Sequence, residues 1–177
     1  MRIGIIGSGY VGTVTGAGLA DLGNDVIFVD LDPDRVEALN RGKSPIFEPG
    51  LDALLAKTRG RYHATTDYGE LLQSDISFIT VGTPSHDDGS IDLGYVRSAA
   101  AELGKVIQQK ESFQLVVVKS TVIPGTTEEV VRSLLEDVSK KQAGEDFGLA
   151  MNPEFLREGS AVHDFFNPDS ELCVPST

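Results

Sequence analysis

The sequence predicts an α/β fold: one Rossmann-like, doubly wound parallel sheet that forms a single domain. Short apolar runs alternate with helical patterns along the chain, and this order is typical of a parallel sheet with right-handed crossovers. The run at 115–118 (Leu-Val-Val-Val) is apolar throughout, as expected of a strand buried on both faces. The length of 177 residues suits one domain, and no repeat or long linker divides it.

The expected strands and helices alternate in chain order, with turn residues between them. Apolar runs predict strands at residues 2–6, 25–29, 62–65, 75–81, 114–119 and 147–151. Helical patterns occupy residues 10–22, 33–40, 50–57, 68–72, 93–109 and 124–140. Asp32 and Pro33 suit the N-cap and first position of the second helix, and Asp92 can cap the fifth.

Charge and cysteine content exclude several classes of function. The formal net charge of -12 would repel a phosphodiester backbone, so we expect no nucleic-acid partner. No apolar run approaches the roughly 20 residues that cross a bilayer, and the N-terminus lacks a secretory layout. We therefore expect a cytoplasmic protein without a membrane partner. Cys173 is the single cysteine; neither it nor any histidine pair has metal-ligand spacing, so we expect no metal.

A glycine-rich turn follows the first expected strand directly. Residues 7–12 read Gly-Ser-Gly-Tyr-Val-Gly. Gly7 permits a tight turn, Gly9 leaves the backbone open to a pyrophosphate, and Gly12 lets the helix pack closely on the strand. The N-terminus of that helix offers N–H groups and a partial positive charge to phosphates. The motif alone also fits a plain strand–helix turn, but its context favours a dinucleotide site.

Asp30 ends the second expected strand, where a carboxylate can accept hydrogen bonds from the ribose hydroxyls of a dinucleotide. The same charge would repel a 2′-phosphate, which favours NAD over NADP. Arg35 qualifies this choice, because an arginine beside the adenosine can tolerate that phosphate. Asp30 could instead only cap the next helix, although Asp32 and Asp34 are also available for that task.

Three later strands end in polar residues at the sheet edge where ligands bind. They run into Val81-Gly82-Thr83-Pro84, Lys119-Ser120-Thr121-Val122 and Asn152-Pro153-Glu154. Asn152 and Pro153 suit the start of a short helix, on which Glu154 and Glu158 would share one face. One interpretation is that both acids are solvated at the start of the helix. The other is that one carboxylate transfers protons while the other contacts cofactor or substrate. Ser120 has no evident base, so a hydrolase is rejected.

Five ordered motifs resemble the UDP-glucose/GDP-mannose 6-dehydrogenase family over residues 1–169. They are Ile3 to Gly12, Ile46 to Leu51, Val81 to Pro84 with Asp88-Gly89 and Asp92-Leu93, Lys119 to Thr126, and Asn152 to Gly159 followed by Ala161, Asp164 and Asn167-Pro168-Asp169. The first motif alone indicates only dinucleotide binding. The last is the most specific, and five in order carry the resemblance to this family.

The resemblance implies the NAD-binding domain of an enzyme that oxidises the C6 alcohol of a nucleotide sugar to a carboxylate and reduces two NAD molecules. A cysteine would capture an aldehyde-level intermediate, which is oxidised to a thioester and hydrolysed. Glu154 would be the acid/base carboxylate of that hydrolysis, and Thr121 would help to hold the water. The NAD site would comprise Gly7, Gly9, Tyr10, Val11, Gly12, Asp30, Arg35, Val81, Gly82, Thr83, Pro84, Ser120, Thr121 and Glu158. The nucleotide sugar would contact Glu154, Phe155, Leu156, Arg157 and Glu158.

The sequence departs from the family pattern after residue 169. The catalytic cysteine of the family belongs to a glycine-rich motif far downstream, and the middle helix and C-terminal substrate domain have no counterpart among these residues. Cys173 lacks the glycine-rich frame, and residues 170–177 form an atypical tail. We therefore expect an NAD-binding domain at 1–169 that binds NADH but does not turn over substrate by itself.

The resemblance leaves the substrate open. UDP-glucose is the expected substrate, and GDP-mannose and UDP-N-acetyl sugars are the alternatives, because base and sugar contacts lie largely in the domain that is absent. The whole protein is expected to be a homodimer or larger. Two other interpretations stay open: a non-catalytic NAD-binding module, and a different two-domain NAD enzyme acting on hydroxy acids or acyl thioesters. The second does not explain residues 152–159.

Overall fold

The computed structural model describes residues 1–168 and 174–175, and its strands form one seven-stranded sheet in the order β3-β2-β1-β4-β5-β6-β7. The strands are β1 (Arg2–Ile6), β2 (Asp25–Val29), β3 (Tyr62–Thr65), β4 (Ile76–Ile79), β5 (Leu115–Val118), β6 (Gly148–Met151) and β7 (Val174–Pro175). The helices are α1 (Tyr10–Asp21), α2 (Pro33–Asn40), α3 (Leu51–Lys57), η1 (Tyr68–Gln73), α4 (Gly94–Gln109), η2 (Thr126–Val131), α5 (Arg132–Ser139) and α6 (Ala161–Phe166). Strands β1 to β6 all pair in parallel, so the predicted fold class is confirmed.

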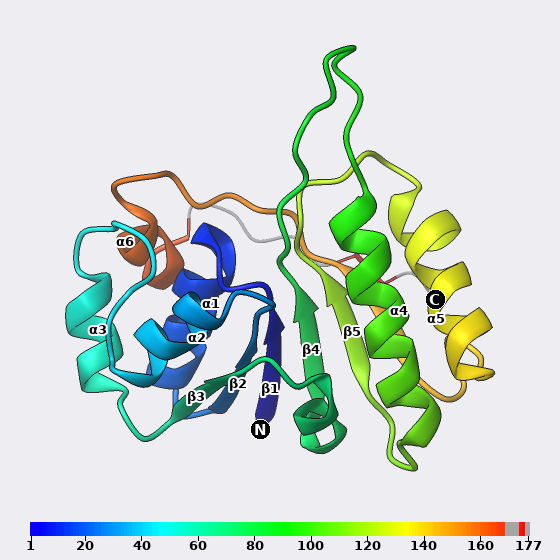
Figure 1. The fold of residues 1–177 in the computed structure, drawn as a ribbon, viewed down its shortest axis with the longest axis horizontal. Coiled ribbons are helices and arrows are strands. Elements are labelled where there is room, and N and C mark those ends of the chain that lie inside the picture. The colour runs from blue at the N-terminus through cyan, green and yellow to red at the C-terminus, as the bar shows by residue number, and fades with distance from the viewer. Residues whose placement is uncertain (169–173, 176–177) are drawn as a thin grey trace.

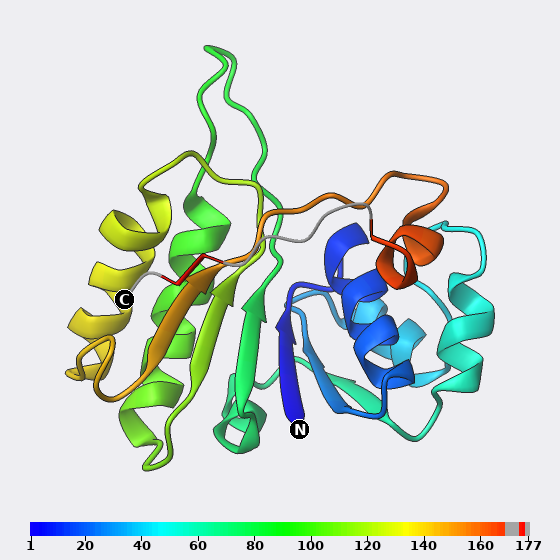
Figure 2. The same ribbon diagram turned by 180° about the vertical axis from the view of Figure 1, so that it is seen from behind.

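Helices cover the two faces of the sheet in separate groups. α4 and α5 lie side by side on one face (Figure 1), whereas α1, α3 and α6 lie on the other (Figure 2). Leu103 of α4 and Leu135 of α5 are buried in one core with β5. Val14 of α1 and Leu55 of α3 are buried in a second core with β1 and β2. Because the covering helices change face between β1 and β4, a crevice opens at the carboxyl ends of these two strands.

The strand β1 is nearly all apolar and lies at the centre of the sheet. Ile3, Ile5 and Ile6 are all buried, which explains why the strand shows no polar alternation. Gly4 has a packing role within it. A Cβ at Gly4 would lie 2.5 Å from Cδ2 of Leu71, so the glycine makes room for η1 to cross the sheet.

The edge strand β7 was not predicted. Val174 and Pro175 pair antiparallel with Met151 and Ala150 of β6, so the sheet is mostly rather than wholly parallel. The tail expected at 170–177 is described only at these two residues, and Cys173 lies outside the described residues. Within the described ranges, no helix has both the length and the apolar character that a bilayer crossing needs.

The helix expected at 124–140 starts later and in a different form. Gly125 has a left-handed φ of 91°, so it cannot belong to a right-handed helix. The helical turns begin at Thr126 with the π-helix η2 and continue as α5. Gly50 is similar, because its φ of 83° makes it the left-handed residue that precedes α3. Both predicted helices therefore began too early in the chain.

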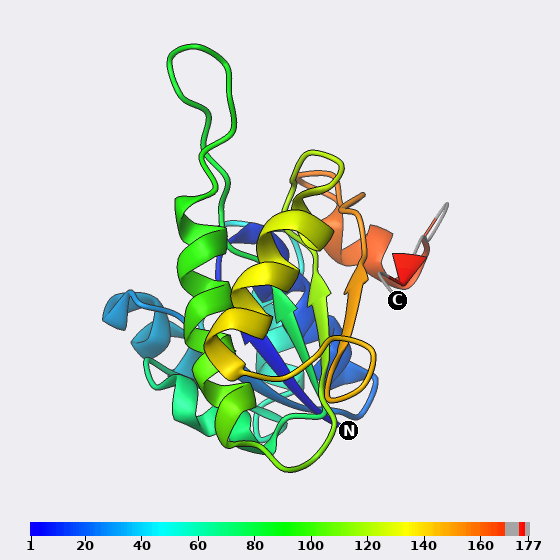
Figure 3. The ribbon, with the colours of Figure 1, turned by 90° about the vertical axis from the view of Figure 1, so that its right-hand side faces the viewer.

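The connection from β4 to α4 rises well above the sheet edge as a long loop (Figure 3). Ser85 and Ile91 form an isolated antiparallel bridge across it, and the His86 N–H donates to the Ser90 carbonyl at 2.8 Å. The Gly94 N–H then donates to Asp92 at 2.7 Å. Asp92 therefore orders the chain entering α4, but the N-cap position is Leu93, one residue after the cap that we predicted.

Candidate functional site

The glycine turn after β1 has the geometry that its sequence predicts. Gly7 adopts a φ of 97°, which only glycine takes without strain. A Cβ at Gly12 would lie 1.9 Å from the Gly7 carbonyl oxygen, so α1 packs directly on the turn. A Cβ at Gly9 would meet only Nη1 of Arg35 at 3.7 Å. The backbone at Gly9 is therefore the open face of the turn, where a phosphate can approach the N-terminus of α1.

Two side chains outside the glycine motif hold this turn in place. Thr80, just past β4, donates its hydroxyl to the carbonyls of Ile6 at 2.9 Å and Gly7 at 2.8 Å. Asp30, just past β2, accepts bonds at 2.6 Å from both the N–H and the hydroxyl of Ser8. The turn is thus bonded to both neighbouring strands before any ligand binds. Thr80 was not predicted as a site residue, because a threonine that ends an apolar run carries no distinctive pattern.

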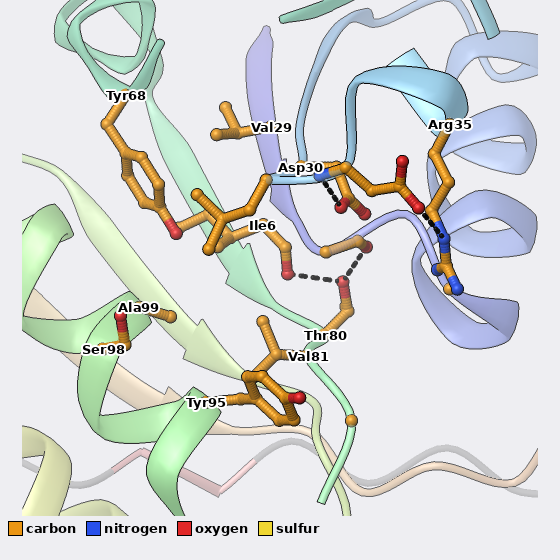
Figure 4. A pocket seen from close by; sticks show the side chains of 15 residues that line it. Ile6, Val29, Asp30, Arg35, Tyr68, Thr80, Val81, Tyr95, Ser98 and Ala99 are labelled. Atoms are coloured by element: carbon orange, nitrogen blue, oxygen red, sulfur yellow. Dashed lines mark hydrogen bonds and ion pairs between the residues drawn. The ribbon is translucent and has the colours of Figure 1, made fainter. Parts of the chain in front are cut away.

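A cavity of about 470 Å³ lies beside the turn, at the carboxyl ends of β1, β2 and β4. Figure 4 shows its labelled side chains converging from both sides of the crevice. It is lined by Ile6, Gly7, Gly9, Val29, Asp30, Leu31, Asp32, Arg35, Tyr68, Thr80, Val81, Gly82, Tyr95, Ser98 and Ala99. Six of the predicted cofactor residues are therefore brought together here: Gly7, Gly9, Asp30, Arg35, Val81 and Gly82.

The Asp30 carboxylate has room for a ligand hydroxyl. Its Oδ2 accepts both bonds from Ser8, and its Oδ1 accepts the Asp32 N–H at 3.0 Å. A carboxylate offers about four acceptor sites, so one remains on Oδ1. The carboxylate lines the cavity, and this remaining site suits a ribose hydroxyl.

Arg35 lies across the open face of the glycine turn. Its Nε lies 3.5 Å from Oδ2 of Asp32, and its guanidinium faces Gly9. Both side chains are substantially exposed, so the pair contributes little to stability. Its position instead allows the guanidinium to reach an anionic group bound at Gly9.

Several predicted cofactor residues do not line this cavity. The Ser120 hydroxyl is buried and donates to the Val81 carbonyl at 2.7 Å, so it ties the end of β5 to the end of β4. The Thr83 hydroxyl donates to the Thr121 carbonyl at 2.8 Å, which joins the next residues of the same two connections. Tyr10, Val11, Gly12, Thr83, Pro84, Ser120, Thr121 and Glu158 are absent from the cavity lining.

The short helix predicted to start at Asn152 is wrong. Residues 152–157 have no regular helical structure, and α6 begins only at Ala161. The Asn152 N–H instead donates to the Val118 carbonyl at 2.9 Å, which extends the β5–β6 ladder by one residue. An Asn-Pro pair suits a helix start, but here the strand pairing outweighs it. Glu154 and Glu158 therefore do not share a helical face.

Glu154 lies in a small charged cluster past β5 and β6. Lys119 donates to Oδ1 of Asn152 at 2.8 Å and lies 3.7 Å from Oε2 of Glu154. Oε1 of Glu154 accepts a short bond from the Leu156 N–H. Within the described part of the chain, the buried Oε2 accepts no hydrogen bond. Glu154 thus keeps a free acceptor next to a cation, which suits a carboxylate that exchanges a proton with a ligand.

The segment that follows Glu154 borders a second cavity of about 480 Å³, on the α1 and α6 side of the sheet. Predicted substrate residues Phe155, Leu156 and Arg157 line it together with Lys119 and Asn152. Nε and Nη2 of Arg157 donate to the two carboxylate oxygens of Asp164 at 3.0 and 2.7 Å. This fork fixes the segment on α6. The bonds from Arg157 hold the pKa of Asp164 well below its usual value.

Glu48 is another residue of the site that sequence reasoning missed. Although buried, its carboxylate accepts bonds from the Tyr10 hydroxyl at 2.7 Å, the Gly159 N–H at 2.8 Å and the Ala161 N–H at 2.9 Å. Burial alone would raise the pKa of Glu48, but these bonds outweigh it and keep the pKa below its ordinary value. Burial, with Glu48 alongside, raises the pKa of Tyr10. The motif at 46–51 drew attention to this position without indicating its partners.

These features define a dinucleotide-binding Rossmann domain with a second, carboxylate-containing site along the same sheet edge. The chain belongs to the UDP-glucose/GDP-mannose dehydrogenase family, and residues 1–173 match the family's NAD binding domain. Among the described residues, no three His, Cys, Asp or Glu side chains are grouped as a metal site requires.

Relatives and solved structures of this family span both substrate nucleotides. The chain is 52% identical to a UDP-glucose 6-dehydrogenase of Haloferax volcanii, covering 100% of this chain and 41% of the relative. It is 50% identical to a GDP-mannose 6-dehydrogenase of Pseudomonas aeruginosa, and the match covers 95% of this chain and 39% of that relative. A crystal structure of a ternary complex of GDP-mannose dehydrogenase from that organism superposes with a TM-score of 0.96 at 49% identity, covering 98% of this chain and 40% of that one. The chain thus spans about 40% of the length of these relatives.

Proposed function

We propose that this chain is the NAD-binding part of a nucleotide-sugar 6-dehydrogenase that oxidises UDP-glucose to UDP-glucuronate with two NAD⁺. The observation that carries the proposal is the pairing of two sites on one sheet edge. The cavity lined by Asp30 suits a dinucleotide, and the second cavity is lined by Lys119, the ion-pair partner of Glu154. When bound, NAD⁺ would accept the hydride that leaves the C6 carbon of the sugar.

The residues of the first cavity would hold the cofactor. The N–H groups around Gly9 would bind the pyrophosphate, with Arg35 above it, and the free acceptor of Asp30 would bind the adenosine ribose. Val81 and Gly82 would form the wall past β4. Thr83, Pro84, Ser120 and Thr121 would extend this wall toward the nicotinamide end, while Tyr10, Val11 and Gly12 would position the start of α1. Glu158, which the structure leaves exposed, is proposed to contact the outer part of the cofactor.

The residues past β5 and β6 would act on the sugar. Glu154 would take and return a proton at the C6 centre, and Lys119 lies beside it, 3.7 Å from its Oε2. Thr121 would hold the water that attacks in the hydrolytic step. Phe155, Leu156, Arg157 and Glu158 would border the nucleotide sugar. We propose that the whole enzyme supplies the cysteine and the remaining sugar contacts, and that it is a homodimer or larger.

UDP-glucose is the proposed substrate because the Haloferax relative is a UDP-glucose 6-dehydrogenase and shares 52% of its residues over the chain. GDP-mannose is the second candidate, because the Pseudomonas enzyme is nearly as similar at 50%. NAD and nucleotide sugars are both metabolites of the cytoplasm, and we place the protein there.

Calorimetric titration of the purified chain tests this proposal. We expect NADH to bind with a one-to-one stoichiometry and NADPH to bind more weakly. We expect no NAD⁺ reduction with UDP-glucose by the chain itself, because Glu154 would lack its cysteine partner. Turnover assays of the whole enzyme with UDP-glucose, GDP-mannose and UDP-N-acetylglucosamine then decide the substrate. Preference for GDP-mannose there would overturn the UDP-glucose assignment.

A further inference from the structure

The dinucleotide cavity has an end that neither the glycine turn nor Asp30 accounts for. If the pyrophosphate lies at Gly9 and the ribose at Asp30, the base attached to that ribose must lie deeper in the crevice. There the lining changes from polar to apolar, with Val29, Val81 and Ala99 forming the walls. A purine ring fits such a slot by its faces, but its edge carries ring nitrogens and substituents that need polar partners.

Tyr68 is the residue that meets this need. It begins the 3-10 helix η1, which crosses from β3 toward β4. The side chain packs partly buried against the core that contains α4. Figure 4 shows its ring reaching inward, with the hydroxyl directed into the cavity between the side chains of Ile6 and Ala99. The phenol is therefore delivered to the deep end by an element that carries no part of the glycine motif.

Among the residues that the structure describes, the Tyr68 hydroxyl has no hydrogen-bond partner that would compete with a ligand. Across residues 1–168 and 174–175, no group forms a hydrogen bond with it. The hydroxyls of two other partly buried tyrosines, Tyr10 and Tyr62, are both hydrogen-bonded within the fold. The Tyr10 hydroxyl is bonded to Glu48, and the Tyr62 hydroxyl donates to the Leu55 carbonyl at 3.3 Å.

The hydroxyl also keeps its proton throughout the useful pH range. Burial, together with the negative charges of Glu102 and Asp30, raises the pKa of Tyr68 to about 12. A neutral phenol both donates and accepts hydrogen bonds. It can therefore pair with a ring nitrogen of adenine or with its exocyclic amino group.

Tyr68 also closes the deep end of the cavity. A third hollow, distinct from the two cavities described above, begins on the other side of Tyr68. It shares Leu31, Tyr68 and Ser98 with the dinucleotide cavity. Beyond this boundary the lining becomes polar, with Asp67, Glu102, Lys105 and Gln109. The tyrosine ring thus limits how far a base can extend.

We propose that Tyr68 is the base-recognition residue of the dinucleotide site, and that its hydroxyl bonds to the edge of the adenine ring. This inference rests on the proposed binding of NAD. Tyr68, which lies on η1, would determine specificity alongside the cofactor residues of the glycine turn and the strand ends.

Titration of Tyr68→Phe with NADH and with ADP-ribose tests the proposal. The variant removes one hydroxyl and keeps the ring, so the fold should be unchanged, as checked by the thermal unfolding midpoint. We expect binding of both ligands to weaken about three- to tenfold, the usual effect of one lost hydrogen bond. Tyr62→Phe is the matched control, since Tyr62 packs on Phe28 of β2 and does not line the cavity.

The outcomes separate this inference from the proposed function. If wild-type chain binds NADH while Tyr68→Phe binds ADP-ribose equally tightly, NAD binding stands and the role of Tyr68 is overturned. If Tyr62→Phe weakens binding as much as Tyr68→Phe, the effect is not local and the role is likewise overturned. If the folded wild-type chain binds neither ligand, the proposed function falls and this inference falls with it.

Discussion

The Tyr10 hydroxyl donates a 2.7 Å hydrogen bond to the buried carboxylate of Glu48, and this contact joins the two halves of the site. Tyr10 begins α1 immediately after the glycine turn. Glu48 in turn accepts the N–H groups of Gly159 and Ala161. The segment with the proposed substrate contacts is therefore fixed to the helix that is proposed to bind the phosphates, across more than 100 residues of sequence.

Replacing Glu48 should destabilise the domain strongly. Glu48→Ala leaves the Gly159 and Ala161 N–H groups without their acceptor and leaves the Tyr10 hydroxyl only the Arg157 carbonyl at 3.1 Å. Unsatisfied buried donors cost about 1–3 kcal/mol each. We expect a loss of about 3 kcal/mol or more in the free energy of unfolding by urea. Glu37→Ala is the control, because Glu37 forms an exposed pair with Arg41 and should change stability by less than about 1 kcal/mol. Equal effects of the two variants would contradict the assigned role of Glu48.

Stability should fall on acidification through Glu48 and Asp164. Both carboxyls have a lower pKa in the folded state than in the unfolded chain. Their contribution is therefore complete above about pH 4, the ordinary carboxyl range, and is lost as the pH falls through the folded-state values. Urea unfolding between pH 7 and pH 3 should show this decline, and Asp164→Asn should make it shallower. An unchanged pH slope in that variant would show that Asp164 is not responsible.

Two glycines of the turn should respond oppositely to alanine. At Gly12 a Cβ would overlap the Gly7 carbonyl, so Gly12→Ala should cost at least about 3 kcal/mol of stability or prevent folding. At Gly9 the φ of -71° is open to any residue and the nearest atom would lie 3.7 Å away. Gly9→Ala should therefore keep stability within about 1 kcal/mol.

The two variants differ in binding as well. Because the Cβ of Gly9→Ala occupies the face where the pyrophosphate should lie, NADH should bind at least about tenfold more weakly, a loss of about 1.4 kcal/mol. Thermal unfolding and NADH fluorescence measured on the same samples check both effects. Normal NADH affinity in Gly9→Ala would move the phosphate site away from this turn.

Asp30 should determine both affinity and the choice of cofactor. Asp30→Ala removes the proposed acceptor of the ribose hydroxyls, and a bond to a charged group contributes about 1.5–3 kcal/mol. We expect NADH to bind roughly 10- to 100-fold more weakly while NADPH binding falls less, since the 2′-phosphate is no longer repelled. Asp34→Asn, an exposed change on the neighbouring helix, should leave both affinities unaltered. A variant that loses affinity for both dinucleotides equally would argue against ribose recognition.

Sequence patterns predicted the fold well because its signals are local. The apolar run of β5 and the glycine pattern from Gly7 to Gly12 each predict the local structure from a few consecutive residues. The Glu48 bonds could not be predicted in this way, since their partners are distant in sequence and two of them are backbone N–H groups. Asn152 shows a third case, in which a good local helix signal is overridden by pairing with Val118. Tyr68 carries no motif, and only the crossing of η1 brings it to the cavity.

We propose above all that the turn at Gly7 to Gly12, together with Asp30, forms a working NAD site in this chain. A calorimetric titration of the folded, purified chain with NADH measures this directly. We predict saturable binding to one site per chain and weaker binding of NADPH. A chain that shows a cooperative unfolding transition but releases no heat with NADH, and does not alter its fluorescence, would contradict it.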